Sequence, residues 1–296
     1  MNMQKRILIT GQNSFIGTSF ENWCMRLNTD YQFTTIDMQE DNWRYFDMSA
    51  FDTVFHVAGI AHVSFDPKLK PLYERVNRDL TLETARKAKS DGVRQFIFMS
   101  SIIVYGDSSP IGISKIISRD TKPEPSNDYG RSKLQAEQGL LALQSDQFRV
   151  AIIRPPMVYG KGSKGNYPKL AKFAGSFPLF PDIRNQRSLI HIDNLCEFIR
   201  LTVDHEAAGI FYPQNREHAS TSEIVRLIAE VRGKKIRLIR LFNPLLRLLG
   251  KRVHLISRTF GNLAYDLSLS DYYDYAYCIH DLADSIRATE TAQSGN

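Results

Sequence analysis

The chain has 296 residues, 43% of them hydrophobic and 24% charged, with a formal net charge of +6. This composition excludes a disordered chain, and the length allows a large core in one or two lobes without disulfides or metals. The positive charge is concentrated, because nine basic residues and no acidic residue lie between Arg232 and Arg258. We therefore expect no dispersed nucleic-acid-binding surface and no nucleic-acid partner.

The cysteines and the amino terminus predict a cytoplasmic protein. Cys24, Cys196 and Cys278 lie far apart and lack the Cys-x-x-Cys spacing of metal ligands, which favours free thiols in a reducing compartment and no metal site. The apolar run after the first residues is too short for a signal peptide, and no stretch of about 18 apolar residues follows it.

Five short β-rich runs alternate with helical patterns in the first half of the chain. They span residues 6–10, 33–37, 53–57, 95–100 and 149–154. Nearly continuous apolar runs of this length are typical of strands covered on both faces, and the intervening helices imply parallel crossovers. The sequence therefore predicts an α/β fold with a doubly wound parallel sheet.

After Arg154 the pattern changes to loops rich in glycine, proline and asparagine, followed by scattered helices. We expect a smaller lobe against the carboxyl edge of the sheet, where open α/β sheets bind ligands. The predicted sheet domain comprises residues 1–155 and about 186–205. The lobe comprises about 156–185 and 206–289, and residues 290–296 form a flexible tail.

A glycine turn directly follows the first predicted strand and opens a helical pattern that continues to about Leu27. The turn reads Thr-Gly-Gln-Asn-Ser-Phe-Ile-Gly from Thr10 to Gly17. Backbone N–H groups and the positive end of the helix dipole then converge on one spot, which suits a pyrophosphate. A glycine-rich loop without a ligand is the structural alternative.

Asp37 ends the second predicted strand about twenty residues after this turn, where a carboxylate can accept both ribose hydroxyls of an adenosine. A 2′-phosphate would need a cation, and none occurs between Asp37 and Arg44. NAD(H) is therefore favoured, while NADP(H) stays open. A solvated carboxylate at a strand end is the alternative for Asp37.

Tyr129 and Lys133 stand four residues apart, on one face of a predicted helix. A tyrosine pKa of about 10 is too high for a base at neutral pH, but an adjacent ammonium and a positive cofactor charge would stabilise the phenolate. Ser101 follows a strand that ends at the same sheet edge, so its hydroxyl can bind the oxygen whose proton the tyrosine takes. The Tyr–Lys pair alone is common as a surface contact, whereas the three groups together predict an acid/base site.

Further motifs extend the pattern from Ile7 to about Thr289. They occupy residues 56–59, Asn77, 154–160, 165–166 and 187–193. In this order the motifs resemble the extended short-chain dehydrogenase/reductase superfamily, in particular its NAD-dependent epimerases, dehydratases and ketoreductases of nucleotide sugars. The resemblance implies a Rossmann-type sheet, a smaller C-terminal substrate-binding lobe and a UDP-sugar as the substrate.

The resemblance also implies roles for individual residues. Tyr129 is the acid/base, Lys133 binds the nicotinamide ribose and lowers the tyrosine pKa, and Ser101 orients the substrate C4 oxygen. The other implied cofactor contacts are Gly11, Ser14, Phe15, Ile16 and Gly17 at the pyrophosphate, Asp37 at the adenosine ribose, Asp47 and Met48 at the adenine, Val57, Ala58, Gly59 and Asn77 beside the cofactor, and Pro156 at the nicotinamide. Asn166 and Arg187 are implied contacts of the substrate diphosphate.

The sequence departs from the family pattern at two places near the cofactor. Ser14 replaces the usual middle glycine, and its Cβ would obstruct close backbone approach or a positive φ at a cost of about 1 kcal/mol. We expect somewhat weaker cofactor binding. The segment between Asp37 and Asp47 is also shorter than in the family, where it includes a helix.

The residues after Ser101 bear on the reaction type. In the 4,6-dehydratases of the family an acidic pair follows the serine or threonine, whereas Ile102 and Ile103 can neither donate nor accept a proton. Asp107 is a poor substitute, so dehydration is disfavoured. Ketoreduction and epimerisation at C4 need the same Ser-Tyr-Lys set, and both remain.

The surrounding pattern resembles enzymes of bacterial capsule and O-antigen precursor synthesis that reduce UDP-4-keto-6-deoxy-N-acetylhexosamines. We therefore place a 4-reductase of surface polysaccharide precursor synthesis ahead of a 4-epimerase of UDP-glucose, UDP-galactose or their N-acetyl forms. A non-catalytic NAD-binding scaffold on the same fold is the alternative of another class.

Relatives commonly dimerise, which implies a homodimer through the helices predicted at 69–90 and 129–145. The segment 241–250, inside the basic stretch 232–258, resembles a short interfacial helix that could rest on an anionic membrane leaflet. The alternative is a helix of the smaller lobe whose leucines are core and whose cations attract an anionic sugar nucleotide. His62 and His191 are expected to pack rather than to catalyse.

Overall fold

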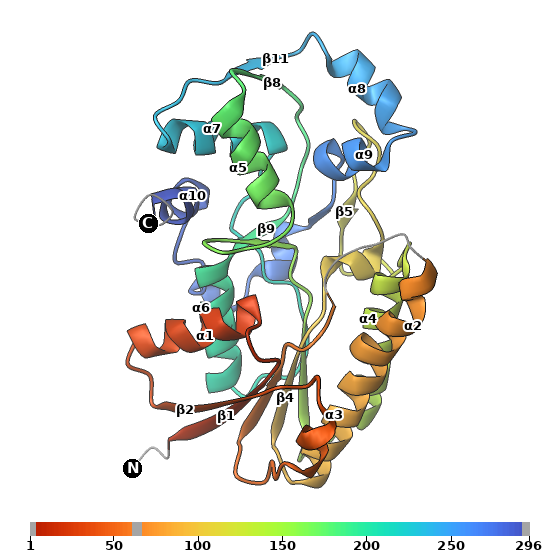
Figure 1. Cartoon of the computed structure of the whole chain (residues 1–296), viewed down its shortest axis with the longest axis vertical. Coiled ribbons are helices and arrows are strands. Elements are labelled where there is room, and N and C mark those ends of the chain that lie inside the picture. The colour runs from red at the N-terminus through yellow and green to blue at the C-terminus, as the bar shows by residue number, and fades with distance from the viewer. Residues whose placement is uncertain (1–3, 61–66, 292–296) are drawn as a thin grey trace. The chain divides into compact units, whose positions relative to one another are not determined.

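The computed structural model describes residues 4–60 and 67–291 (Figure 1), so His62 lies outside the described residues. The chain divides into two compact units. The first comprises Met1–Gly106, Pro123–Pro155 and Cys196–Tyr212, and the second comprises Asp107–Lys122, Pro156–Leu195 and Pro213–Asn296. This division differs from the predicted lobes, since residues 107–122 and 186–195 belong to the second unit and residues 206–212 to the first.

The first unit is built on a six-stranded sheet in the order β10-β6-β4-β3-β1-β2. The strands are β1 (Lys5–Thr10), β2 (Tyr31–Ile36), β3 (Thr53–His56), β4 (Gln95–Met99), β6 (Arg149–Ile153) and β10 (Gly209–Phe211). Every pairing in this sheet is parallel, which confirms the predicted fold class. The five predicted strands are present, whereas the three residues of β10 are too few to give a periodic pattern.

Helices cover both faces of the sheet. The helices α1 (Phe15–Arg26) and α6 (Ile192–Asp204) lie on one face, and α2 (Lys70–Tyr73), α3 (Leu80–Ser90) and α4 (Asp128–Leu143) lie on the other (Figure 1). Leu8, Val54 and Phe96 belong to one core cluster with side chains of α3 and α4. Phe55 of β3 instead meets Phe20 of α1, with ring centroids 5.4 Å apart. Burial on both faces explains the continuous apolar runs in the sequence.

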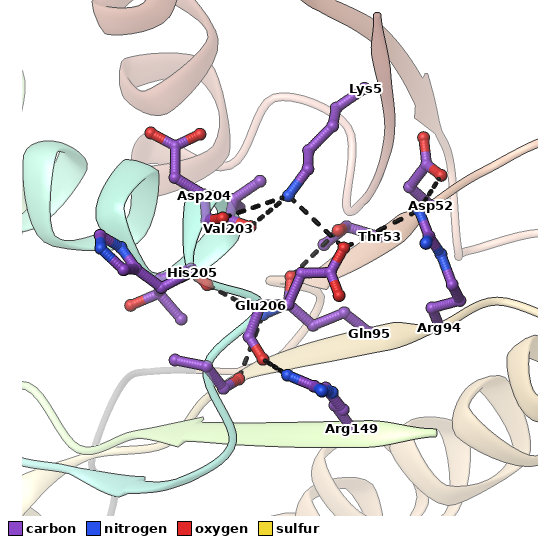
Figure 2. Close-up of polar contacts among 12 residues, drawn as sticks. Lys5, Asp52, Thr53, Arg94, Gln95, Arg149, Val203, Asp204, His205 and Glu206 are labelled. Carbon is purple, nitrogen blue, oxygen red and sulfur yellow. Dashed lines mark hydrogen bonds and ion pairs between the residues drawn. The ribbon is translucent and has the colours of Figure 1, made fainter. Parts of the chain in front are cut away.

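A group of polar contacts lies at the amino-terminal edge of the sheet, where β1, β3, β4 and β6 begin (Figure 2). Gln95 is 1% exposed, and its amide nitrogen donates to the carbonyl oxygens of Thr202 (2.9 Å) and Ala207 (3.1 Å). Its amide oxygen accepts from the hydroxyl of Thr53 (3.0 Å). Lys5 Nζ donates to the carbonyl oxygen of Val203, in the last turn of α6, at 2.7 Å. These bonds hold the turn between α6 and β10, so the polar residues of this edge have a structural role.

The described part of the second unit contains three two-stranded sheets and five α-helices besides the start of α6. The strands are β5 (Ile116–Ile117), β7 (Met157–Tyr159), β8 (Leu179–Pro181), β9 (Leu189–His191), β11 (Arg237–Ile239) and β12 (Ala264–Tyr265), which pair as β5–β12, β7–β9 and β8–β11. The helices are α5 (Asn166–Ser176), α7 (Thr221–Val231), α8 (Asn243–Gly250), α9 (His254–Phe260) and α10 (Leu282–Thr291). Apolar side chains of α5, α7 and α10 form its core.

The C-terminal helix runs further than predicted. Helix α10 continues to Thr291, and the carboxylate of Glu290, which is 3% exposed, accepts from Arg232 Nε at 2.5 Å. This buried ion pair places residues 290 and 291 in the folded unit rather than in a flexible tail, and residues 292–296 lie outside the described part of the chain. No helix among the described residues combines the length and the hydropathy that a membrane crossing requires.

Candidate active site

The predicted phosphate turn has the backbone that a pyrophosphate site needs. Gly11 adopts φ of +121°, and a Cβ there would lie 2.9 Å from the backbone nitrogen of Ala58, so only glycine fits without strain. Phe15 and Ile16 begin α1, and the N–H groups of a first helical turn have no carbonyl partner within the helix. The turn therefore presents N–H groups and the helix dipole to an anion.

Ser14 does not strain the turn, which corrects the expected cost. Its φ of −69° and ψ of 135° are extended values that any residue adopts. The residue with a positive φ is Asn13, at 59°, and asparagine tolerates this region better than most residues. The Ser14 hydroxyl instead caps α1 by accepting from the N–H of Gly17 at 3.2 Å. The serine thus stabilises the helix that carries the site.

The predicted adenosine side holds two exposed carboxylates and one core residue. Asp37 follows β2 directly, is exposed, and accepts from the N–H of Gln39 at 2.9 Å. Asp47 is also exposed, and the backbone N–H of Ser49 lowers its pKa. The Met48 side chain is fully buried in the hydrophobic core. A side-chain contact of Met48 with adenine is therefore ruled out in this structure, and the short segment before it is a 3₁₀ turn instead of the family's helix.

A second glycine that leaves space for the cofactor, Gly59, lies after β3, beside the predicted nicotinamide end. A Cβ on Gly59 would lie 3.1 Å from Asn77 Oδ1 and 3.3 Å from Lys133 Nζ, so the absent side chain leaves room against two polar groups. Asn77 is fully buried and holds the turn by accepting from Ile60 N (2.8 Å). Its amide nitrogen donates to Ser132 Oγ at 3.2 Å. These observations fit a dinucleotide along residues 11–17 and 57–59.

Asn77 sits in a π-helical turn, Glu74–Asp79, between α2 and α3. Such insertions are rare and occur mostly near functional sites. From this turn Asn77 bonds both Ile60 and Ser132 of α4, so it positions the loop after β3 against α4. The sequence motif located Asn77, but the π geometry has no signal in the sequence.

Tyr129 and Lys133 lie on the buried face of α4, where they are 8% and 5% exposed. Lys133 Nζ donates to the carbonyl of Met99 at 2.8 Å and lies 4.5 Å from the ring centroid of Phe98. Burial lowers the pKa of Lys133 to about 8, and the nearby Glu137 partly opposes this change. The ammonium thus lies at the carboxyl end of β4.

The pKa of Tyr129 is raised, whereas the sequence analysis expected the neighbouring Lys133 to lower it. Burial raises it to about 12, Tyr73 adds to the increase, and a hydrogen bond with Ser101 opposes it. Ser101 itself caps the 3₁₀ turn Ile102–Tyr105, with its hydroxyl accepting from Ile103 N at 3.3 Å. Ser101 and Tyr129 therefore meet as predicted, but the protein alone keeps the phenol protonated.

Two buried residues near Tyr129 were not predicted from the sequence. Tyr73 is 2% exposed and places its ring centroid 6.1 Å from that of Tyr129. Asn127 caps α4 through its side-chain oxygen, which accepts from Gly130 N at 2.9 Å. Its Nδ2 atom is buried and has no hydrogen-bond partner within the described protein. Since an unsatisfied buried donor costs about 1–3 kcal/mol, this amide is a candidate ligand contact two residues from the phenol.

The next inward position of α4 carries a buried ion pair. Glu137 is 1% exposed and accepts from Arg154 Nε at 3.0 Å and Nη2 at 2.5 Å. The hydroxyl of Ser100 also donates to this carboxylate. Tyr105 OH accepts from Arg154 Nη1 at 2.6 Å. The network ties α4 to β6 and to the segment that carries Ser101, so it positions the acid/base groups.

His56 of β3 is neutral at physiological pH. It is fully buried between the hydroxyls of Thr10 (2.7 Å from Nδ1) and Thr81 (3.0 Å from Nε2). Burial, followed by the charge of Lys133, lowers its pKa to about 3. The imidazole is thus hydrogen-bonded at both ring nitrogens and joins the end of β1 to α3.

In the second unit, Asn166 and Arg187 line one pocket, together with Lys169, Thr221, Arg258 and apolar side chains. Asn166 is the first residue of α5, whose N-terminus favours an anion. Burial and the charge of Arg258 lower the pKa of Arg187 to about 10. Two neighbouring guanidinium groups and a lysine make this pocket suitable for a diphosphate. Arg258 and Lys169 were not predicted, and Pro156, assigned to the nicotinamide, is buried in this unit.

One cluster of metal-binding residue types occurs among the described residues, namely His191, Asp193 and His280. Asp193 Oδ2 lies 3.4 Å from His280 Nε2 and 4.0 Å from His191 Nδ1. The same Nδ1 atom accepts from the Asp193 N–H at 3.3 Å. That bond and the 2% exposure of His191 match the packing role predicted for this histidine.

A model of the NAD dependent epimerase/dehydratase family matches residues 7–212. The chain belongs to the NAD dependent epimerase/dehydratase family. It is 31% identical to the UDP-glucose 4-epimerase of Vibrio cholerae, over 90% of this chain and 88% of that protein. It is also 26% identical to the N-acetyl-alpha-D-glucosaminyl-diphospho-ditrans,octacis-undecaprenol 4-epimerase of Escherichia coli O157:H7, over 88% and 82% of the two chains.

Among solved structures, MoeE5 in complex with UDP-glucose and NAD has the same fold. The TM-score is 0.71 at 19% identity, over 98% of this chain and 100% of that one. Membership of the NAD dependent epimerase/dehydratase family confirms the predicted superfamily and the NAD cofactor. Other solved chains of this fold contain NADP or NADPH.

Proposed function

We propose that the chain is an NAD-dependent 4-epimerase of a hexose carried on a diphosphate, with a UDP-hexose as the first candidate substrate. The observation that carries this proposal is the 31% identity to a UDP-glucose 4-epimerase along nearly the whole of both chains. The E. coli relative is also named a 4-epimerase. This proposal reverses the order expected from the sequence patterns, which placed a 4-reductase first.

The acid/base step rests on three residues of the first unit. In its phenolate form Tyr129 takes the proton of the C4 hydroxyl while the hydrogen on C4 leaves as hydride. The proton returns to the same oxygen after hydride has been added to the opposite face of C4, and Ser101 Oγ holds this oxygen throughout. Bound NAD supplies a two-electron acceptor at C4 that is restored when the sugar is reduced again. Because burial raises the pKa of Tyr129 to about 12, the phenolate needs positive charge beside it, and Lys133 Nζ is the protein's own source.

The diphosphate is the part of the substrate best matched by charge. The pocket of Arg187, Arg258, Lys169 and Asn166 in the second unit offers three cations and a helix N-terminus. Both relatives are named for sugars that are diphosphate esters, one on uridine and one on undecaprenol. Recognition of the diphosphate is common to both, so we take it as the substrate class.

A 4-ketoreductase is the second candidate, because ketoreduction uses the same Ser101, Tyr129 and Lys133. Ile102 and Ile103 support both reactions over dehydration, since neither can move a proton. A non-catalytic scaffold is the weaker alternative, because the acid/base set is complete. The homodimer, the cytoplasmic location and the place in surface polysaccharide synthesis stay predictions.

The test is to incubate purified protein with UDP-galactose or UDP-N-acetylgalactosamine without added cofactor and to follow the C4 epimers by NMR. We expect turnover, lost at least about 10²-fold in Tyr129→Phe and unchanged in the matched control Tyr45→Phe, whose parent side chain is 89% exposed. Absence of epimerisation, together with stoichiometric NADH consumption on a 4-keto sugar nucleotide, would establish the reductase instead. Biological activity that is unaffected by Tyr129→Phe would establish the scaffold.

A further inference from the structure

The surface of the second unit carries an unusual concentration of apolar side chains. Of the seventeen large hydrophobic side chains exposed among the described residues, seven lie within fifteen consecutive positions. These seven are Leu241, Phe242, Leu245, Leu248, Leu249, Val253 and Leu255. We call residues 241–255 the apolar segment. The expectation that its leucines are core is therefore wrong for most of them, because only Leu246 packs against the core cluster of this unit.

The exposed leucines follow the period of helix α8. Leu245, Leu248 and Leu249 are 53%, 64% and 38% exposed, and their spacing of three and four residues places them on one side of the helix. Leu241, just before the helix, is 80% exposed. The opposite side is anchored, since Gly250 is buried near Ile111. Figure 1 shows α8 at the periphery of this unit, beside the β8–β11 pair. The apolar segment thus presents one apolar face to solvent.

The charged residues of the sequence stretch that carries this face all have one sign. Residues 232–258 contain nine arginines and lysines and no carboxylate. Arg247, Lys251 and Arg252 are exposed within the apolar segment, and none of the three pairs with a carboxylate among the described residues. Arg240, by contrast, contacts Asp182 at 2.7 Å. Basic side chains at the flanks of an apolar helix face are the signature of helices that lie in the headgroup region of a bilayer.

An apolar pocket extends the face inward. Its eight lining residues come from α5, β8, β11 and the start of α8, and all are apolar: Phe173, Leu179, Phe180, Pro181, Ile239, Phe242, Leu245 and Leu246. The cavity has a volume of about 300 Å³, which is enough for part of a hydrocarbon chain. Phe242 and Leu245 belong to both the pocket and the exposed face, so the two form one continuous apolar surface.

We infer that the apolar segment docks the protein on an anionic lipid bilayer, with α8 lying in the plane of the headgroups. Leucines would enter the acyl region, and Arg247, Lys251 and Arg252 would meet lipid phosphates. A second copy of the chain fits this face less well. An isologous contact would place two such basic segments against each other without a carboxylate between them. The inference does not rest on the proposed reaction, because vesicle binding needs no sugar.

The experiment measures flotation of the full chain with vesicles of phosphatidylcholine alone and of phosphatidylcholine with about 30% phosphatidylglycerol. We expect binding to the anionic vesicles only, with a loss as NaCl rises from about 0.1 to about 0.5 M. Leu245→Asp with Leu248→Asp should weaken the binding at least about tenfold. The matched control is Met25→Asp, at a side chain that is 57% exposed on α1 of the other unit, and it should bind like the parent.

A second variant protects the test against misfolding. Arg247→Gln with Lys251→Gln leaves every apolar side chain in place and should weaken binding to anionic vesicles severalfold. Circular dichroism of all variants checks the fold. Binding that is absent on anionic vesicles, or equal for the leucine variant and the Met25→Asp control, would overturn the inference. It would also be overturned by a dimer in light scattering that only the leucine variant dissociates, without vesicle binding.

Discussion

Replacement of Lys133 by methionine should make the protein more stable while it abolishes activity. Lys133 is 5% exposed on α4. Its ammonium forms no ion pair among the described residues, and the charge of Glu137 raises its pKa only in part against the effect of burial. Burial lowers the pKa of this ammonium to about 8 from an ordinary value of 10.5. Methionine keeps the unbranched shape and volume without the charge.

The size of the effect follows from the pKa. Since a pKa change of one corresponds to about 1.4 kcal/mol, the buried charge costs the fold about 3 kcal/mol at neutral pH. The substitution also removes the bond from Nζ to the carbonyl of Met99 (2.8 Å), which is worth about 1 kcal/mol. We therefore expect Lys133→Met to raise the free energy of unfolding at pH 7 by about 2 kcal/mol.

The pH dependence separates this cause from improved packing. Below the folded pKa of about 8 the lysine is charged in both the folded and the unfolded chain, so the whole cost is present. Between pH 8 and 10.5 the folded protein releases its proton first, so the parent gains stability relative to the variant. The advantage of Lys133→Met should thus shrink across this window. Urea unfolding at several pH values measures it.

The matched control is Lys172→Met, at an exposed lysine of α5. This variant should change the free energy of unfolding by less than about 0.5 kcal/mol and independently of pH. The reasoning fails if Lys133→Met is destabilised at pH 7. It fails equally if its stability relative to the parent is constant from pH 7 to pH 10.

Three further outcomes follow from the geometry of the first unit. Gly11→Ala should lower the free energy of unfolding by about 2 kcal/mol, because φ is +121° and Ala58 blocks the Cβ. It should also weaken NAD binding in a fluorescence titration, and an unchanged NAD affinity would contradict the pyrophosphate site at this turn. Ser14→Ala should cost about 1 kcal/mol and Ser14→Gly only a few tenths in urea unfolding, and the reverse order would refute the capping role. Gln95→Leu should cost about 2–4 kcal/mol with kcat unaltered, since it removes the partners of the Ala207 carbonyl and of the buried Thr53 hydroxyl. A neutral result would contradict this structural role.

The sequence contains enough information for the sheet and the acid/base set because both follow local rules. A buried parallel strand needs a continuous apolar run, so β1, β3 and β4 are visible without a structure. Tyr129 and Lys133 fall on one helix face through spacing alone, and Ser101 is placed by the end of β4. The turn at Gly11 is equally local, since one backbone conformation demands glycine.

Other features depend on contacts between distant residues. The conformation of Ser14 could not be predicted, because the sequence does not show which residue of the turn has the positive φ. In the structure this residue is Asn13 and not Ser14. In the sequence Glu137 is indistinguishable from an ordinary charge on a helix, because only the fold brings Arg154 beside it. The exposure of the leucines in α8 was unpredictable for the same reason, since an apolar stripe has the same sequence pattern whether protein or lipid covers it.

The pairing of Glu137 with Arg154 also fixes the rotation of α4 about its own axis. Positions 129, 133 and 137 follow one another along its inner side, and Glu137 accepts two hydrogen bonds from Arg154, directly after β6. Gln138 then necessarily points outward, and it is exposed. A fluorophore attached there would sit a few helical turns from the phenol without entering its surroundings. Ligand occupancy could be read from the outer wall of the helix while every inward-facing side chain stays native.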